Sequence, residues 1–304
     1  MSVENFIRAE NRALERFGIE AERRLVDVPA LGGQAHVLVA GDGPPVMMVI
    51  GAGPPAAIWA PLMAELRRFT LYVVDLPGMG RTDPVRYTTA TVRSTAVDFL
   101  GQVLDGLGLD RPPFVAQSVG GLWATWFALE RPDRVPALVL VAAPALILGN
   151  AAPLPLRLIS VPALGPILMR LQPPSPKQID RMAALAGEDF TAVPELRELW
   201  VALERLPTYG PALCQLINAN ERLRGARPEL ALTAEQLAQI LQPVQFIWGE
   251  GDLFGSPALG ERAAEIVPNA ELHIVPGGHA PWLNHAEQIG SLAAPFLRKH
   301  SVAP

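Results

Sequence analysis

The chain has 304 residues and a formal net charge of −5 at pH 7, and 50% of its residues are hydrophobic. This length and composition exclude a disordered chain and favour an α/β domain that carries an insertion. The basic residues are scattered without a cluster, which excludes the electrostatic footprint of a nucleic-acid-binding protein.

Nothing in the sequence directs the chain out of the cytoplasm. The first ten residues carry charges where a signal peptide needs an apolar core. The longest uncharged apolar stretch, Val135 to Leu156, is interrupted by prolines and makes a poor membrane helix. Cys214 is the only cysteine, so an intrachain disulfide is excluded. We therefore expect a cytoplasmic protein without stable membrane insertion.

Hydrophobic periodicity predicts that strands and helices alternate through the first half of the chain. The expected elements are helix 5–17, strands 24–28 and 35–40, strand 46–50, helix 57–68, strand 71–75, helix 89–106, strand 114–117 and strand 137–142. Continuous apolar strands that alternate with helices imply a mostly parallel sheet with helices on both faces.

The alternation stops near Leu146 and resumes after Ile240, with strand 244–248, helix 257–266, strand 271–275 and helix 287–300. The intervening block is helical, with proline-rich connections. This pattern predicts a core formed by residues 1–145 and 242–304, into which a helical cap, residues 146–241, is inserted after the sixth strand.

Ser118 lies at the junction between the strand 114–117 and a helical run. Small residues two positions before it, Ala116, and two positions after it, Gly120, are typical of a nucleophile elbow. Such a turn holds the serine in a strained conformation and leaves the N–H of Val119 free at a helix N-terminus. We interpret Ser118 as a candidate nucleophile.

A serine nucleophile needs a general base and an acid that orients it. Of the five histidines, only His279 lies in a glycine-containing loop just past a predicted sheet strand. His285, at the start of the final helix, is the competitor. Asp252 follows the strand 244–248 directly and is the candidate acid, with Glu250 ranked second.

Acyl transfer also needs an oxyanion hole. The loop that follows strand 46–50 can place the N–H of Ala52 opposite that of Val119. We expect a substrate pocket lined by Gly51, Gly53, Gln117 and Trp282. Asp75 ends a strand as well, but its surroundings indicate a turn that supports its own loop.

A different interpretation starts from the same loop. Residues 51–56 have the pattern G-x-G-x-x-A after a strand, and Asp75 ends the next strand about 20 residues later, as a dinucleotide-binding fold requires. Against this, Pro54 and Pro55 crowd the start of the phosphate-binding helix. A nucleotide site would also leave the Ser118 and His279 patterns unexplained. We expect neither a cofactor nor a metal.

Together, these segments resemble the α/β-hydrolase superfamily over nearly the whole chain. The matching pieces, in the family's order, are Gly51-Ala52-Gly53-Pro54, Asp75-Leu76-Pro77-Gly78-Met79-Gly80, the Ser118 elbow, Trp248-Gly249-Glu250-Gly251-Asp252 and Gly278-His279-Ala280-Pro281-Trp282. The resemblance implies an eight-stranded sheet and a triad of Ser118, Asp252 and His279.

The loop from Gly51 to Trp59 also resembles that of C–C bond hydrolases acting on ring-cleavage products of aromatic compounds. Two positions depart from the family patterns. Ile50 stands where the family usually has a histidine before the oxyanion loop, and Gln117 stands where C–C hydrolases carry an asparagine.

The first part of the insertion, Leu146 to Leu171, is almost uncharged and rich in leucine, isoleucine and proline. It could form an apolar roof over a hydrophobic pocket or simply the core of the insertion. Arg157, Arg170 and Arg181 could bind a substrate carboxylate or lie on the solvated surface.

The leading hypothesis is a cofactor-independent serine hydrolase that cleaves carboxylic esters of hydrophobic, small to medium substrates through an acyl-enzyme. The alternatives are C–C bond hydrolysis of ring-cleavage products, and a lactonase, a thioesterase or a biosynthetic acyl-transfer enzyme on the same fold. A non-catalytic small-molecule receptor is a further alternative. The sequence leaves a homodimer possible.

Overall fold

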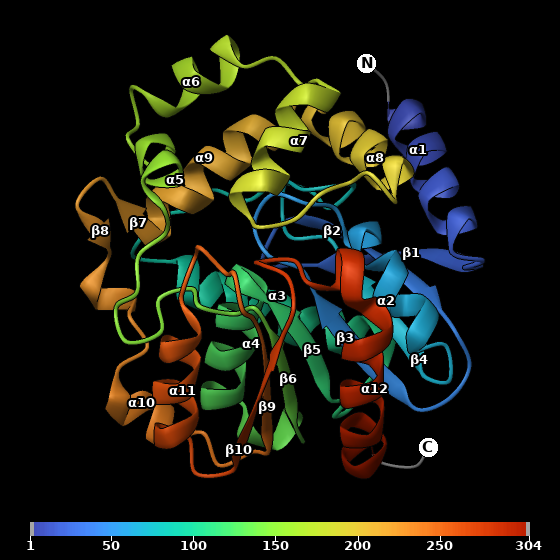
Figure 1. Cartoon of the computed structure of the whole chain (residues 1–304), viewed down its shortest axis with the longest axis vertical. Helices are drawn as coiled ribbons and strands as arrows, with labels where there is room; N and C mark the ends of the chain where they lie inside the picture. The colour runs from blue at the N-terminus through green and yellow to red at the C-terminus, as the bar shows by residue number, and fades with distance from the viewer. Residues whose placement is uncertain (1–2, 302–304) are drawn as a thin grey trace.

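The computed structural model describes residues 3–301, and one eight-stranded sheet forms its centre (Figure 1). The strand order is β1-β2-β4-β3-β5-β6-β9-β10. The strands are β1 (Ala21–Val28), β2 (Gly33–Ala40), β3 (Pro45–Val49), β4 (Thr70–Val74), β5 (Phe114–Gln117), β6 (Leu138–Val141), β9 (Val244–Gly249) and β10 (Ala270–Val275). β2 pairs antiparallel with β1 and β4, and the other pairings are parallel. The expected mostly parallel sheet is confirmed.

Helices cover both faces of this sheet (Figure 1). α2 (Ala60–Glu65) packs against α12 (Trp282–His300) on one face, and α3 (Val92–Leu107) packs against α4 (Ser118–Glu130) on the other. α11 (Pro257–Ile266) contacts β9 and β10. Because the central strands are covered on both sides, β3, β5 and β6 are buried almost completely, which is why they appear in the sequence as unbroken apolar runs.

The chain between β6 and β9, residues 142–243, contains most of the remaining helices, and we call it the helical insertion. Its elements are α5 (Leu154–Ile159), α6 (Gly165–Leu171), α7 (Pro176–Leu185), α8 (Pro194–Glu204), α9 (Tyr209–Asn220), β7 (Glu221–Arg222), β8 (Gly225–Ala226), η3 (Pro228–Leu230) and α10 (Ala234–Ala238). α5 to α9 lie above the carboxyl ends of the parallel strands, whereas α10 packs beside α11 (Figure 1).

The structure corrects three sequence expectations for the elements. The helix expected at 57–68 is a 3-10 turn, η1 (Ala56–Trp59), followed by the short α2. The last helix begins at Trp282 instead of residue 287, because a first helical turn joins the main helix across a kink at His285. The hairpin of β7 and β8 was not expected, since two-residue strands leave no periodicity in a sequence.

The N-terminal helix α1 (Val3–Arg16) lies against α8 of the helical insertion (Figure 1). Its buried side includes Phe6 and Leu14, and Arg12 forms an ion pair with Glu198 at 3.1 Å. The exposed ion pair contributes little, at most about 1 kcal/mol, so the apolar side of α1 holds the two helices together.

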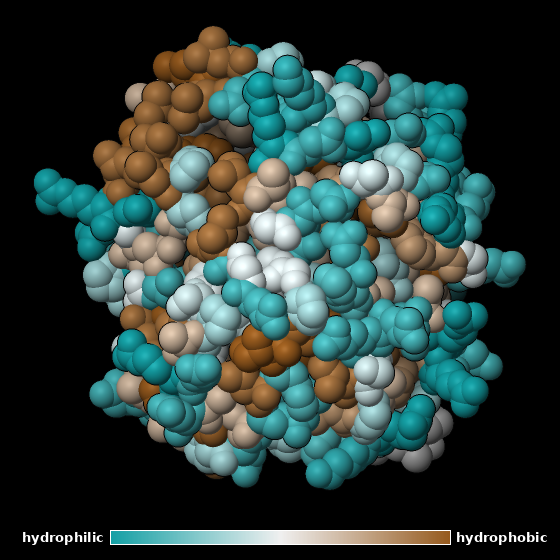
Figure 2. Space-filling model, viewed as in Figure 1, coloured by the Kyte–Doolittle hydropathy of each residue, from teal (hydrophilic) through white to brown (hydrophobic). Residues whose placement is uncertain are grey.

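Figure 2 shows an apolar surface at the upper left, over α5 and α6. Leu154, Ile167 and Leu171 are exposed there. Other side chains of the segment from Leu146 to Leu171, such as Leu146 and Ile159, line the cavity described below. Some apolar side chains of this nearly uncharged segment therefore line the cavity, and others are exposed on the surface. Within residues 3–301, none of the helices combines the length and apolar character needed to cross a bilayer.

Helix α4 approaches the end of β3 so closely that residue 120 has no room for a side chain. A Cβ atom on Gly120 would lie 2.4 Å from the carbonyl oxygen of Ile50 and 2.5 Å from that of Val49. Gly120→Ala is therefore expected to lower the free energy of unfolding by about 1–3 kcal/mol, measured by urea denaturation.

Gly101→Ala is the matched control, because Gly101 lies inside α3 and the nearest atom to its new methyl group would be a Phe127 ring carbon at 3.5 Å. Alanine favours helix by about 1 kcal/mol over glycine, so this variant should be at least as stable as the parent. Equal stabilities of the two variants would contradict the packing argument.

Candidate active site

Ser118 stands at a strained turn between β5 and α4. Its φ angle is +50°, in the left-handed region that non-glycine residues rarely adopt. The Ser118 N–H donates a hydrogen bond to the carbonyl of Ala142, directly after β6, at 3.1 Å, and this bond stabilises the turn. Ala116, on β5, is fully buried, and its backbone pairs with Val49 of β3 and Leu140 of β6. The serine hydroxyl consequently projects toward the helical insertion.

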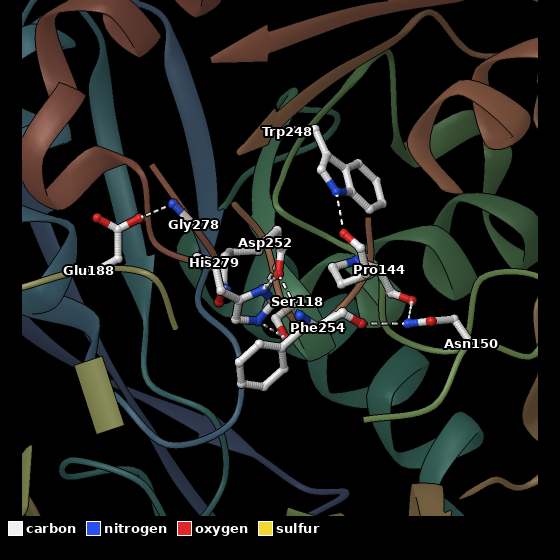
Figure 3. A network of polar contacts seen from close by, with 11 residues as sticks. Ser118, Pro144, Asn150, Glu188, Trp248, Asp252, Phe254, Gly278 and His279 are labelled. Carbon is white, nitrogen blue, oxygen red and sulfur yellow. Dashed lines mark hydrogen bonds and ion pairs between the residues drawn. The ribbon is translucent and has the colours of Figure 1, made fainter. Parts of the chain in front are cut away.

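The loops after β9 and β10 bring Asp252 and His279 to Ser118 (Figure 3). His279 Nε2 lies 3.0 Å from Ser118 Oγ, and His279 Nδ1 lies 3.0 and 3.1 Å from the two Asp252 oxygens. An ionised carboxylate only accepts hydrogen bonds, so Nδ1 carries the proton and Nε2 is left to accept the Ser118 O–H. This geometry suits activation of the hydroxyl.

The loop that carries Asp252 is fixed by contacts that the sequence did not indicate (Figure 3). The Phe254 N–H donates to Asp252 Oδ1 at 2.8 Å, and the Phe254 ring stacks on the His279 imidazole with 3.8 Å between centroids. Asn150 donates to the Phe254 carbonyl at 2.8 Å. Because Phe254 stands two residues after the acid, its proximity to His279 depends on how the loop folds back.

Gln117 joins the oxyanion loop to the His279 loop. Its side-chain oxygen accepts from the Gly51 N–H at 3.1 Å, and its amide nitrogen donates to the His279 carbonyl at 3.0 Å. Gly51, expected in the pocket wall, instead lies behind it, because it packs directly on Gln117 and Ser118. The other residues expected there, Gly53, Gln117 and Trp282, do line the cavity.

Ala52 and Val119 both line the cavity that contains Ser118. The Val119 N–H belongs to the first turn of α4, where helix N–H groups have no partner within the helix. Among the described residues, none accepts a hydrogen bond from the Ala52 N–H. Both N–H groups are therefore candidate hydrogen-bond donors to a ligand in the cavity.

Asp75 supports more than its own turn. Its carboxylate accepts from the Ala56 N–H at 2.7 Å, and it contacts Nδ1 of the buried His36 at 2.8 Å. These bonds tie β2, the Asp75 turn and the segment after the oxyanion loop together. His36 is thus a buried partner of Asp75.

The loop between α7 and α8 holds the His279 loop from the opposite side (Figure 3). Glu188 accepts from the Gly278 N–H at 2.5 Å and from the Asn284 amide at 3.0 Å. The His279 N–H donates to the Ala186 carbonyl at 2.6 Å. Burial raises the pKa of Glu188, while its hydrogen bonds to Gly278 and Asn284 act against this shift. The helical insertion thus contacts the candidate base directly.

A cavity of about 180 Å³ opens at Ser118, between the sheet and the helical insertion. Its walls are largely apolar, with contributions from Leu122, Leu146, Met182 and Trp282. Glu188 and Glu221 are its acidic residues, and no Lys or Arg among residues 3–301 lines it. Arg157, Arg170 and Arg181 all lie outside the wall.

The competing candidates lie elsewhere. His285 is outside the cavity at the kink of α12, and Glu250 is exposed to solvent. The oxyanion loop is followed by the four-residue η1, and Asp75 is occupied with His36 and Ala56, so neither feature matches a dinucleotide site. Residues 3–301 contain no cluster of three or more His, Cys, Asp or Glu side chains suited to a metal ion.

Removing the Glu188 carboxylate should loosen the His279 loop. Glu188→Ala is expected to slow the reaction of Ser118 with a fluorophosphonate by roughly tenfold or more, since misplacement of a base by about 1 Å can cost 10²-fold. The labelling rate is measured by intact mass. Glu250→Ala, which removes an exposed carboxylate from the neighbouring loop, should label at the parental rate. Equal rates for both variants would contradict the role of Glu188.

The chain is similar to known proteins in sequence and in fold. Residues 44–164 match a family model described as alpha/beta hydrolase fold. A 2-hydroxy-6-oxononadienedioate/2-hydroxy-6-oxononatrienedioate hydrolase of Cupriavidus pinatubonensis is 31% identical over 263 residues, which cover 83% of this chain and 86% of the relative. A pimeloyl-[acyl-carrier protein] methyl ester esterase of a Shewanella species is 28% identical, with 88% and 96% covered.

A solved structure with the same fold is the carboxylesterase CesB from Bacillus subtilis. It superposes with a TM-score of 0.75 at 22% identity, over 97% of this chain and 98% of the other. The sequence matches, the shared fold and the strand order lead to one conclusion: the chain is a hydrolase and belongs to the α/β-hydrolase fold family.

Proposed function

We propose that this hydrolase cleaves carboxylic esters of hydrophobic, small to medium acids or alcohols, with Ser118, His279 and Asp252 as its catalytic triad. The observation that supports this most is the Ser118–His279–Asp252 hydrogen-bonded chain at a mostly apolar cavity. Such a cavity favours an uncharged substrate through burial of apolar surface.

In the proposed reaction, His279 takes the proton of Ser118 as Oγ attacks the ester carbonyl. The N–H groups of Ala52 and Val119 stabilise the oxyanion, and one such donor is typically worth about 2.7–4 kcal/mol. His279 then gives the proton to the departing alkoxide, which leaves as the alcohol. Water activated by the same imidazole hydrolyses the acyl-enzyme and frees Ser118.

The main alternative is C–C bond hydrolysis of ring-cleavage products, and the two proposals differ in the charge of the expected substrate. The Cupriavidus relative is named for a dioate, a substrate with two carboxylates. The cavity of this chain carries Glu188 and Glu221 and lacks a cation among the described residues. A dianion would therefore be desolvated beside acidic groups, which is unfavourable. The Shewanella relative, by contrast, is named as a methyl ester esterase.

The first test removes the nucleophile. Ser118→Ala should lower kcat for 4-nitrophenyl butanoate by at least about 10³-fold without changing the melting temperature, because the hydroxyl makes the acyl-enzyme. Ser256→Ala, at an exposed serine outside the cavity, is the control and should keep parental turnover. Undiminished turnover by Ser118→Ala would refute the assignment.

The second test decides between the two bond types. We expect kcat/KM for 4-nitrophenyl butanoate to exceed that for a 2-hydroxy-6-oxodienoic acid by at least about tenfold, because the acid brings a carboxylate into a cavity without cations. Both reactions are followed by absorbance with the same enzyme preparation. A preference for the dienoic acid would instead establish C–C bond hydrolysis.

A further inference from the structure

The helical insertion contains a second cavity, of about 500 Å³, in addition to the one at Ser118. Residues of α6 and α9 and the end of α5 line it, and these helices lie together at the upper left of Figure 1. The wall is largely apolar, with Arg170 and Glu204 as its charged residues. Pro166 and Gln215 in this wall are exposed, so the cavity opens to solvent. No step of the proposed reaction uses this cavity.

Helix α9 forms part of the wall of both cavities. The residues of this helix that line the cavity at Ser118 include Tyr209, Leu213 and Ile217. The residues that line the second cavity include Gly210, Cys214 and Asn218. Each set recurs at intervals of four residues, so the two sets form neighbouring stripes along the helix. The two cavities therefore lie on adjacent sides of α9.

The two cavities meet at Ile159, the last residue of α5. Among residues 3–301, Ile159 alone lines both cavities. Leu156, one turn earlier on α5, lines only the cavity at Ser118. α5 packs against α9, and the Asn218 amide on α9 donates to the carbonyl of Ser160, directly after α5, at 2.5 Å. This contact fixes the end of α5 at the place where a passage between the cavities has to run.

The backbone of Ile159 is held tightly, whereas its side chain is not. A Cβ atom on Gly165, at the start of α6, would collide with the Ile159 carbonyl oxygen, so the two backbones are in close contact. The Ile159 side chain is only partly buried, and α5 contains no fully buried residue. Truncation of this side chain should therefore change the passage and leave the fold intact.

The walls on both sides of Ile159 indicate which group could pass it. Both cavities are largely apolar, so they favour a hydrocarbon group over a charged one. The cavity at Ser118 has about 180 Å³, which limits the length of a chain that it can hold. A longer alkyl chain would have to continue past Ile159 into the second cavity. Each methylene group that moves from water into an apolar cavity improves binding about fourfold.

We propose that Ile159 sets the longest alkyl chain that the enzyme accepts, because its side chain separates the cavity at Ser118 from a second apolar cavity that can receive the rest of the chain. This inference rests on the proposed ester hydrolysis and specifies its substrate class. The parent enzyme prefers esters of short alkyl chains, and loss of the Ile159 side chain admits longer ones.

The test measures the ratio of kcat/KM for a long-chain ester to kcat/KM for a short-chain ester. Ethyl octanoate is compared with ethyl butanoate on the acyl side, and octyl acetate with butyl acetate on the alcohol side. Ile159→Ala should raise the ratio at least about tenfold in one of the two series, since several more methylene groups become buried. Unchanged ratios in both series would overturn the proposal.

Leu156→Ala is the matched control. It removes a side chain of the same size from the same helix, but it enlarges only the cavity at Ser118. This variant should keep both ratios close to their parental values. An equal rise in Leu156→Ala and Ile159→Ala would mean that cavity size alone decides, and it would contradict the role of Ile159.

Cys214 allows the second cavity to be blocked. It is the only cysteine of the chain and lies in the wall of this cavity. Burial raises the pKa of its thiol, so alkylation with N-ethylmaleimide is run at mildly alkaline pH and followed by intact mass. Alkylation of Ile159→Ala should return the ratio to the parental value, and an Ile159→Ala, Cys214→Phe double variant should do the same without a reagent.

The Ile159→Ala, Cys214→Ala double variant is the control for the reagent. After the same treatment it should keep the raised ratio, because it has no thiol to modify. A raised ratio that persists when the second cavity is blocked at residue 214 would show that the chain does not enter this cavity, and it would reject the proposal.

Binding without turnover separates this inference from the proposed function. Dissociation constants of the same esters are measured by calorimetry for the Ser118→Ala protein and for the Ser118→Ala, Ile159→Ala double variant. If the parent cleaves none of the esters, the proposed function fails, yet binding of a long-chain ester that is at least about tenfold tighter in the double variant would still support the role of Ile159. Equal constants for the long-chain esters in the two proteins would reject it.

Discussion

The hydrogen-bonded chain from Ser118 through His279 to Asp252 exists only because the carboxyl ends of parallel strands meet at one edge of the sheet. β5, β6, β9 and β10 are adjacent and parallel, so the turns that follow β5, β9 and β10 open on the same side. Residues separated by 27 and 161 positions thereby come within hydrogen-bond distance. If this part of the sheet had antiparallel pairs, the loops would alternate between its two ends.

Hydrogen bonds to backbone groups fix the loops around the Ser118, His279 and Asp252 side chains. Gln117 ties the oxyanion loop to the His279 loop, and Asp75 ties the following segment to β2. The helical insertion contributes as well, because Ala186 and Glu188 bind the backbone of the His279 loop. Two residues that line the cavity, Ala186 and Glu188, therefore also contact the loop that carries the candidate base.

The cavity combines an apolar wall with acidic groups and, among the described residues, without a cation. This composition disfavours a negatively charged ligand in the cavity, because burial of an unpaired charge is costly.

The sequence alone determined the sheet, the order of its main elements, the elbow at Ser118 and the candidates His279 and Asp252. These depend on local signals: apolar runs of strand length, small residues around a serine, and side chains placed directly after strands. Tertiary structure decided the rest. Gly51 lies behind the wall because Gln117 and Ser118 pack on it, and Phe254, Glu188, Trp200 and Tyr209 reach the site through folding of loops and of the helical insertion. No local pattern marks such residues, because their partners are distant in sequence and their proximity is set by packing between elements.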